Sequence, residues 1–242
     1  MVAIGHAHMR IYRNRWHLAA TFFIIVLPLV YLYAFARLSH LAVSGLAGDM
    51  GVSLIRMIVA YLIAAVLGWG SAVLFYRGPF SVIALPIFDV LQCIPTFAVL
   101  PLVVMVLGPS NVTVVLFLIL AIVWPIFFSV VSSLKLIRQD WQEAAQIARL
   151  NGWDYFRLFL WPASLSGLTT GTIVGLGDSW EALIATEIII QVRSGLGIFF
   201  NAHTNSVSLT LFGMLGLLLV IFVINKLLWL PLLEKSHLQL EG

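Results

Sequence analysis

Residues 135–163 read KLIRQDWQEAAQIARLNGWDYFRLFLWPA, a polar stretch between two long apolar runs. Residues 112–134 precede it and residues 164–190 follow it. Each run is long enough to cross a bilayer, since a transmembrane helix needs about 20 predominantly apolar residues. A polar loop between two such runs is typical of a polytopic membrane protein.

The composition of the whole chain agrees with this interpretation. Of its 242 residues, 62% are hydrophobic and only 10% are charged, and the mean hydropathy is +1.07. A soluble domain carries about 25% charged residues. A soluble enzyme and a disordered chain are therefore disfavoured, and the formal charge of +3 is too thinly spread for a nucleic-acid-binding face. The single cysteine, Cys93, can form no internal disulfide and is predicted to be a small buried residue.

Six apolar segments predict an all-α polytopic membrane protein with about six transmembrane helices. The segments lie at 18–36, 52–76, 82–107, 112–134, 164–190 and 208–231. Residues 1–17 then form an N-terminal segment, residues 18–231 the transmembrane domain and residues 232–242 a C-terminal tail. The first segment lacks a small-residue cleavage site, so it is interpreted as a true span and not as a signal peptide.

The distribution of Lys and Arg predicts that both termini are cytoplasmic, because cytoplasmic loops carry an excess of basic residues. This orientation leaves only Arg37, Arg56 and Arg193 outside. The basic residues on the cytoplasmic side are Arg10, Arg13, Arg15, Arg77, Lys135, Arg138, Arg149, Arg157, Lys226 and Lys235. The loop 135–163 is then also cytoplasmic.

The loop itself is predicted to fold into two short helices. Asp140 followed by Glu143 resembles a helix N-cap with its capping-box glutamate. Asn151-Gly152 is expected to stop the first helix, because both residues tolerate a left-handed conformation. A second helix is expected from Trp153 to Leu160, ending before Pro162. The residues alone leave two interpretations open, an interfacial connection between spans or a docking element for a soluble partner.

The loop resembles the EAA loop of ABC-transporter importer permeases. Glu143-Ala144-Ala145 and Pro162 stand at that family's separation, whereas its usual glycine falls at Arg149 and Gly152 follows three residues later. Further segments resemble the nitrate/sulfonate/taurine importer class. They are Ile94-Pro95-Thr96, Leu100-Pro101-Leu102, Gly177-Asp178-Ser179-Trp180 with Glu187, and Ser194-Gly195-Leu196-Gly197.

This resemblance implies a type I importer permease-like fold in a bacterial inner membrane. Such permeases form dimers with a second copy or a homologous permease, receive solute from an external solute-binding protein, and dock onto cytoplasmic ABC ATPase subunits. The implied docking residues here are Glu143, Ala144, Ala145, Arg149 and Gly152. The chain has no Gly-x-x-x-x-Gly-Lys-Ser/Thr run to hold ATP phosphates. We therefore expect no enzyme activity and no cofactor on this chain, with ATP and Mg on the partner ATPase.

Polar residues within the spans are candidates for a translocation path, since ionisable groups are costly there. The candidates are Asp89, Gln92, Asp178, Trp180, Glu181 and Glu187. On a helix Asp178 and Glu181 are about 60° apart, and Glu187 is about 180° from Asp178. The first two are therefore predicted to share a wet cavity, although each acid could instead make a structural hydrogen bond. Because the predicted path is acidic, it would repel anions, and no substrate is predicted.

Gly167, Gly171 and Gly175 recur every four residues and form a small-residue face that allows close helix packing, within one subunit or across a dimer axis. Two other protein classes are compatible with a polytopic chain of this composition. A secondary transporter or channel could use the intramembrane acids, but the chain shows no internal repeat. A membrane enzyme would need a nucleophile–base pair or a metal cluster, and neither is evident. His6 and His8 are interpreted as a solvated tail, and no metal site is predicted.

Overall fold

The computed structural model describes residues 44–226 together with residues 22, 26, 30 and 33. This part of the chain is built from helices, without a strand. The elements are α2 (Ser44–Phe75), α3 (Pro79–Gln92), α4 (Thr96–Leu107), α5 (Asn111–Lys135), α6 (Gln139–Ile147), α7 (Gly152–Tyr155), the π-helix η2 (Phe156–Leu160), α8 (Trp161–Ile190), α9 (Leu196–Ala202) and α10 (Val207–Ile224).

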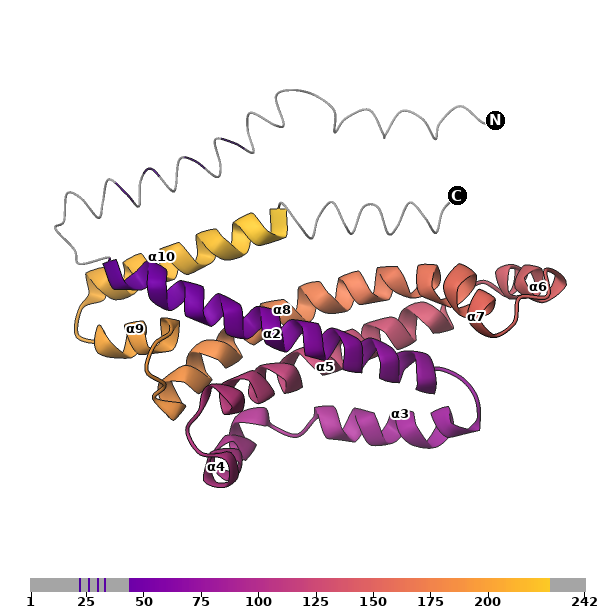
Figure 1. Cartoon of the computed structure of the whole chain (residues 1–242), viewed down its shortest axis with the longest axis horizontal. Helices are drawn as coiled ribbons and strands as arrows, with labels where there is room; N and C mark the ends of the chain where they lie inside the picture. Colours follow the sequence, from indigo (N-terminus) through magenta and orange to yellow (C-terminus); the bar gives the residue numbers. More distant parts are fainter. Residues whose placement is uncertain (1–21, 23–25, 27–29, 31–32, 34–43, 227–242) are drawn as a thin grey trace.

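The long helix α5 is the centre of the molecule and lies against both α2 and α8 (Figure 1). It carries no charged residue before Lys135, and it has buried side chains along its length, among them Phe117, Ile126 and Val130. Ser110 caps its N-terminus by accepting the Thr113 N–H at 3.3 Å. The hydrophobic core therefore follows α5.

Three helices of the described part are long and apolar enough to span a membrane: α2 from Gly45, α5 and α10. They agree with the predicted spans 52–76, 112–134 and 208–231, although the last residues of the third lie outside the described residues. The span 164–190 corresponds to α8, which has the length but carries more serine, threonine and acidic residues. The predicted span 18–36 falls on residues of which the structure describes only four.

The predicted span 82–107 is not one continuous helix in the structure. The segment forms two helices, α3 and α4, that bend by 86° at residues 93–95. Pro95 is the N-cap of α4; its ring removes a backbone donor and disfavours a helical Ile94, so α3 ends at Gln92. Cys93 lies at this break and is exposed, not buried as predicted.

The two ends of the helical body differ. Helices α6 and α7 project at one end, and α9 lies at the opposite end (Figure 1). The expected second loop helix does not stop before Pro162. Instead α7 continues through η2 into α8, and Pro162 occupies the first turn of α8, a position where proline is tolerated.

Candidate functional site

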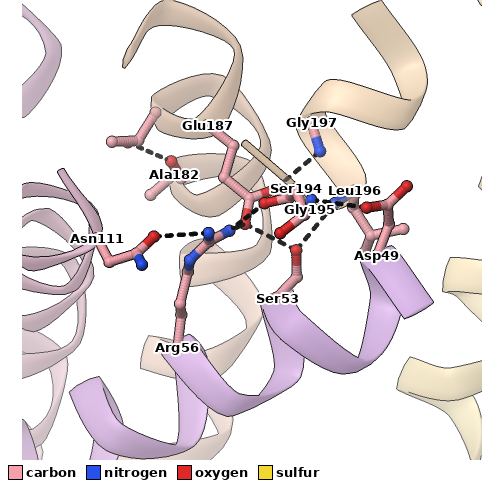
Figure 2. Close-up of polar contacts among 11 residues, drawn as sticks. Asp49, Ser53, Arg56, Asn111, Ala182, Glu187, Ser194, Gly195, Leu196 and Gly197 are labelled. Carbon is pink, nitrogen blue, oxygen red and sulfur yellow. Dashed lines mark hydrogen bonds and ion pairs between the residues drawn. The ribbon is translucent and has the colours of Figure 1, made fainter. Parts of the chain in front are cut away.

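A buried ion pair joins α2 to α8 at the end of the molecule that carries α9. Arg56 Nη1 lies 2.5 Å from Glu187 Oε1, and the two side chains are only 6% and 0% exposed. Figure 2 shows how the guanidinium also reaches two other segments: Nη1 donates to the Ser194 carbonyl at 2.8 Å and Nη2 to Asn111 Oδ1 at 2.7 Å. One side chain thus connects α2, the start of α5, α8 and the turn after α8.

Three consecutive backbone N–H groups, at the end of that turn and at the start of α9, donate to side chains (Figure 2). Gly195 N–H donates to Asp49 Oδ1 at 2.9 Å and Leu196 N–H to Ser53 Oγ at 2.9 Å. Gly197 N–H donates to Glu187 Oε2 at 2.8 Å. The Ser53 hydroxyl in turn donates to Glu187 Oε1 at 2.7 Å, so both carboxylate oxygens are satisfied. Such full satisfaction is what makes a buried charge tolerable.

One candidate residue has a different position from the one predicted. Glu187 is a candidate for the translocation path by sequence, but it is fully buried and paired with Arg56, so it is not open to a path in this structure. Arg56 lies within α2, as the predicted span 52–76 implies, and its side chain is buried. The missed signal is in the sequence itself: an isolated arginine in one apolar run needs a carboxylate from another.

A second polar region lies at the break between α3 and α4. A cavity of about 410 Å³ is lined by Gln92 from the end of α3, by Thr96 from α4, and by Asp178 and Glu181 from α8. The remaining lining residues are Pro95, Phe97, Leu120, Ala121, Trp124, Pro125 and Ala182. Asp178 and Glu181 are exposed, as their spacing predicted. Two carboxylates therefore face one cavity whose lining contains no Lys or Arg.

The other path candidates are arranged differently. Asp89 is not among the lining residues but accepts a hydrogen bond from Gln92 Nε2 at 2.7 Å, and so holds that amide. Trp180 is buried and does not line this cavity. The structure thus brings Gln92, Asp178 and Glu181 together and separates Trp180 and Glu187 from them.

The helix α6 presents part of the predicted docking motif. Glu143 and Ala144 are exposed, and the Glu143 carboxylate accepts from Gln139 Nε2 at 2.9 Å. Ala145 is 5% exposed and faces the chain itself, so it does not have the predicted contact role and instead seats the helix. Ile147, three residues after Ala144 and so on the same side of the helix, is 84% exposed.

The start of α6 also differs from the prediction. The N-cap is Arg138 and not Asp140, which lies in the first turn. Asp140 instead forms an exposed ion pair with Arg138, at 2.6 Å, and accepts the Trp141 N–H at 3.0 Å. Gln142 connects α6 to two neighbours: its amide donates to the Ile137 carbonyl at 3.0 Å, and its carbonyl oxygen accepts from Arg77 in the α2–α3 turn.

Comparison with known proteins identifies the chain. Residues 64–229 match the family described as "Binding-protein-dependent transport system inner membrane component". The chain belongs to this family. The predicted resemblance to importer permeases and the all-α polytopic fold class are thereby confirmed, and the chain is a multi-pass membrane component of a transport system.

Individual permeases of the binding-protein-dependent systems are also similar. The nitrate import permease protein of Synechocystis sp. is 31% identical over 187 residues, which cover 74% of this chain and 68% of that protein. The bicarbonate transport system permease protein of the same organism is 29% identical over 72% of this chain and 65% of its own length. The taurine transport system permease protein of Escherichia coli is 29% identical over 65% of this chain and 60% of its own length. The chain thus aligns with about two thirds of each relative's length.

The backbone conformation of the loop explains the positions of Arg149 and Gly152. Arg149 has φ of +50°, in the left-handed region, where the family's usual glycine would be unstrained. It closes α6 in a Schellman motif: Leu150 N–H donates to the Ala145 carbonyl at 3.1 Å and Arg149 N–H to the Gln146 carbonyl at 2.9 Å. The helix therefore stops at Ile147, ahead of the predicted stop at Asn151-Gly152. Gly152, with φ of +53°, begins α7.

The glycines of the permease's Ser194–Gly197 turn are explained by the carboxylate beside them. A Cβ on Gly195 would lie 2.5 Å from Glu187 Oε2, and one on Gly197 would lie 2.6 Å from Glu187 Cβ. Gly195 also has φ of +143°, which other residues rarely adopt. Glycine at both positions lets this backbone lie close to Glu187, so that the Gly197 N–H reaches Oε2.

The glycine face of α8 lies against α5 of the same chain. A Cβ on Gly167 would lie 2.5 Å from the Ser129 carbonyl oxygen, and one on Gly171 would lie 2.5 Å from the Ile126 Cα. At Gly175 the nearest atom would be the Ile122 carbonyl oxygen at 3.2 Å. The three glycines therefore allow close helix packing within one subunit, the first of the two alternatives that the sequence left open.

Proposed function

We propose that this chain is a translocation subunit of an ATP-driven importer and that it docks onto a separate ATPase through the outer face of α6. The observation that supports the docking role most directly is an exposed alanine and isoleucine, Ala144 and Ile147, beside the exposed Glu143 carboxylate on a helix at the tip of the molecule (Figure 1). A small residue permits close approach, an apolar side chain gains from burial, and a carboxylate can pair with a cation on the partner. ATP and Mg would be held by that partner.

The same end is proposed to be cytoplasmic. At the α9 end of the described residues lie Arg56 and Arg193. At the α6 end lie Arg77, Lys135, Arg138, Arg149 and Arg157. An excess of basic residues marks the cytoplasmic side of a membrane protein. In this orientation α9 and the Ser194–Gly197 turn face outward, toward a solute-binding protein, and a second permease copy or a homologous permease completes the path.

The contacts of α6 explain how ATPase movement would reach the membrane helices. Gln142 is bonded to Arg77 in the turn between α2 and α3, so a displacement of α6 pulls on that turn. The loop also continues into α8 without a break, because α7 and η2 join it directly. A partner that moves α6 therefore acts on two membrane helices.

Co-purification from membranes tests the docking role. The tagged chain should recover an ATPase subunit, and Ala144→Trp or Ile147→Asp should reduce that recovery at least tenfold, since bulk or charge would enter the docking face. Asn205→Trp, at the exposed opposite end, is the matched control and should leave recovery unchanged. Equal recovery with all three variants, each in normal amount in the membrane, would refute docking through this face.

The cavity at the α3–α4 break is proposed to be part of the translocation path. Its lining has two carboxylates and no basic residue, and weak screening in a membrane strengthens their field. The solute carried is therefore proposed to be neutral or positively charged, unlike the nitrate and bicarbonate named for relatives. In an uptake assay, Asp178→Asn with Glu181→Gln should reduce transport of a cation and not that of an anion. Reduced anion uptake would contradict this charge preference.

A further inference from the structure

Polar contacts connect α2 and α8 at three levels, between residues 53 and 69 of α2. At the α9 end, Arg56 and Ser53 bind Glu187. In the middle, the hydroxyls of Tyr61 and Thr172 lie 3.3 Å apart. Toward the α6 end, Trp69 Nε1 donates to Ser164 Oγ at 2.8 Å. From residue 56 to residue 69 a helix rises about 20 Å, so these contacts connect the two helices through most of a bilayer core.

The central helix α5 is fixed to the same pair by backbone contact. The α8 glycines lie directly against α5, and on the other side a Cβ on Gly68 of α2 would lie 2.9 Å from the Val123 carbonyl oxygen. Ser133 of α5 also meets Ser166 of α8, with 2.8 Å between the hydroxyl oxygens. Interfaces this close resist sliding, because any shift produces overlap of backbone atoms.

Among the described residues, no hydrogen bond joins α3 or α4 to α2, α5 or α8. The pair is attached by apolar contacts, such as the ring of Phe88 against those of Phe75 and Phe127. No residue of α3 is buried, and Leu100 is the single buried residue of α4. Between them the chain bends by 86°, and Pro95 leaves the break without a helical hydrogen bond at that position. Pro86 and Pro101 remove one further donor from each helix. Regions with few buried contacts and an interrupted hydrogen-bond ladder are those that move at low energetic cost.

The cavity lies between these two bodies. Gln92 and Thr96 line it from the break, whereas Asp178 and Glu181 line it from α8. We propose that α2, α5 and α8 move as one rigid body during transport and that α3–α4 moves against it about residues 93–95, which opens and closes the cavity. This inference rests on the proposed function, since it assigns the moving part of the proposed path.

Distances between spin labels test the assignment in the complete assembly with its ATPase. Both pairs use a Cys93→Ala background, which removes the single native thiol. Val90→Cys with Val174→Cys measures α3 against α8, and Leu62→Cys with Val174→Cys measures α2 against α8; all three side chains are exposed. Labelled chains are diluted with unlabelled ones so that each assembly holds one labelled copy.

Between the nucleotide-free and the ATP- and vanadate-trapped states, the first distance should shift by several ångströms and the second should not change. A constant α3–α8 distance would overturn the proposal and would indicate that α3–α4 is held by another copy or by lipid. A shifted α2–α8 distance would overturn the rigid body. ATP-dependent uptake by the unlabelled assembly is measured first; its absence would overturn the proposed function and this inference with it, whereas constant distances beside normal uptake overturn the inference alone.

A cross-link provides a second, independent test. Ser133→Cys with Ser166→Cys places two thiols where the hydroxyl oxygens are 2.8 Å apart. Oxidation should join α5 to α8 with no loss of uptake, because these helices do not move relative to each other. Uptake that falls on oxidation and returns on reduction would show that the two helices must separate, which contradicts the proposal.

Discussion

Replacing Arg56 and Glu187 by Met, singly and together, should expose a strong coupling between them. Glu187 is fully buried and accepts from three donors, Ser53, Arg56 and Gly197. Either single substitution leaves one uncompensated buried charge, which costs about 3–5 kcal/mol. The double substitution leaves no charge, and only neutral groups lose a partner. We therefore expect it to cost about as much as one single substitution, a coupling of about 3–5 kcal/mol.

The free energy of unfolding can be measured by SDS titration of the detergent-solubilised chain, followed by tryptophan fluorescence. The matched control is the second ion pair of the described residues, Arg138 with Asp140, whose N–O distance of 2.6 Å is nearly the same. These side chains are 74% and 55% exposed, so the same Met cycle should give a coupling of about 0–1 kcal/mol. The comparison separates the effect of burial from that of ion-pair geometry.

Additive single effects at Arg56 and Glu187 would refute the reasoning. They would mean that the two charges do not compensate each other, for example because water reaches one of them in the membrane. A coupling as small as that of the exposed pair would have the same consequence. In the additive case, the loss of unfolding free energy would come from the hydrogen bonds to the turn and not from the ion pair.

Three further predictions concern the backbone. Gly171→Ala should destabilise the chain by about 1–3 kcal/mol in the same titration, because its Cβ would meet α5 backbone atoms, whereas the control Gly177→Ala, with nothing within 4 Å, should be neutral or stabilising. Arg149→Gly should stabilise the end of α6 by about 1 kcal/mol by relieving its positive φ, seen as slower amide exchange there; faster exchange would contradict it. Asp49→Ala should accelerate exchange at the Gly195 amide, which loses its acceptor, and an unchanged rate would show another acceptor.

How much of this fold could be predicted depends on the kind of signal. Hydropathy located α2, α5 and α10, because burial in a bilayer requires long apolar runs. It could not locate the break in the third span, since the apolar run continues on both sides of Pro95. The proline itself was the local signal: it removes one donor and constrains the residue before it, and only the tertiary arrangement determines whether a helix bends or breaks there.

In the candidate site, too, the sequence predicted features within one helix but not contacts between helices. Helical geometry predicted that Asp178 and Glu181 would share a face and that Glu187 would lie opposite, and the structure places them so. The partner of Glu187 could not be read from α8, because Arg56 is more than a hundred residues earlier in the chain. Periodicity assigns a face within one helix, whereas a contact between helices depends on how they pack.

One helix thus carries two kinds of acid with opposite requirements. Glu187 has every oxygen satisfied by fixed donors, and a group in that state gains nothing from meeting a solute, since any new contact would break an existing one. Asp178 and Glu181 are exposed to a cavity and keep acceptor capacity for something that enters it. The rigid attachment at Glu187 holds α8 in place, and this is what allows Asp178 and Glu181 to keep a fixed position while the opposite wall of the cavity moves.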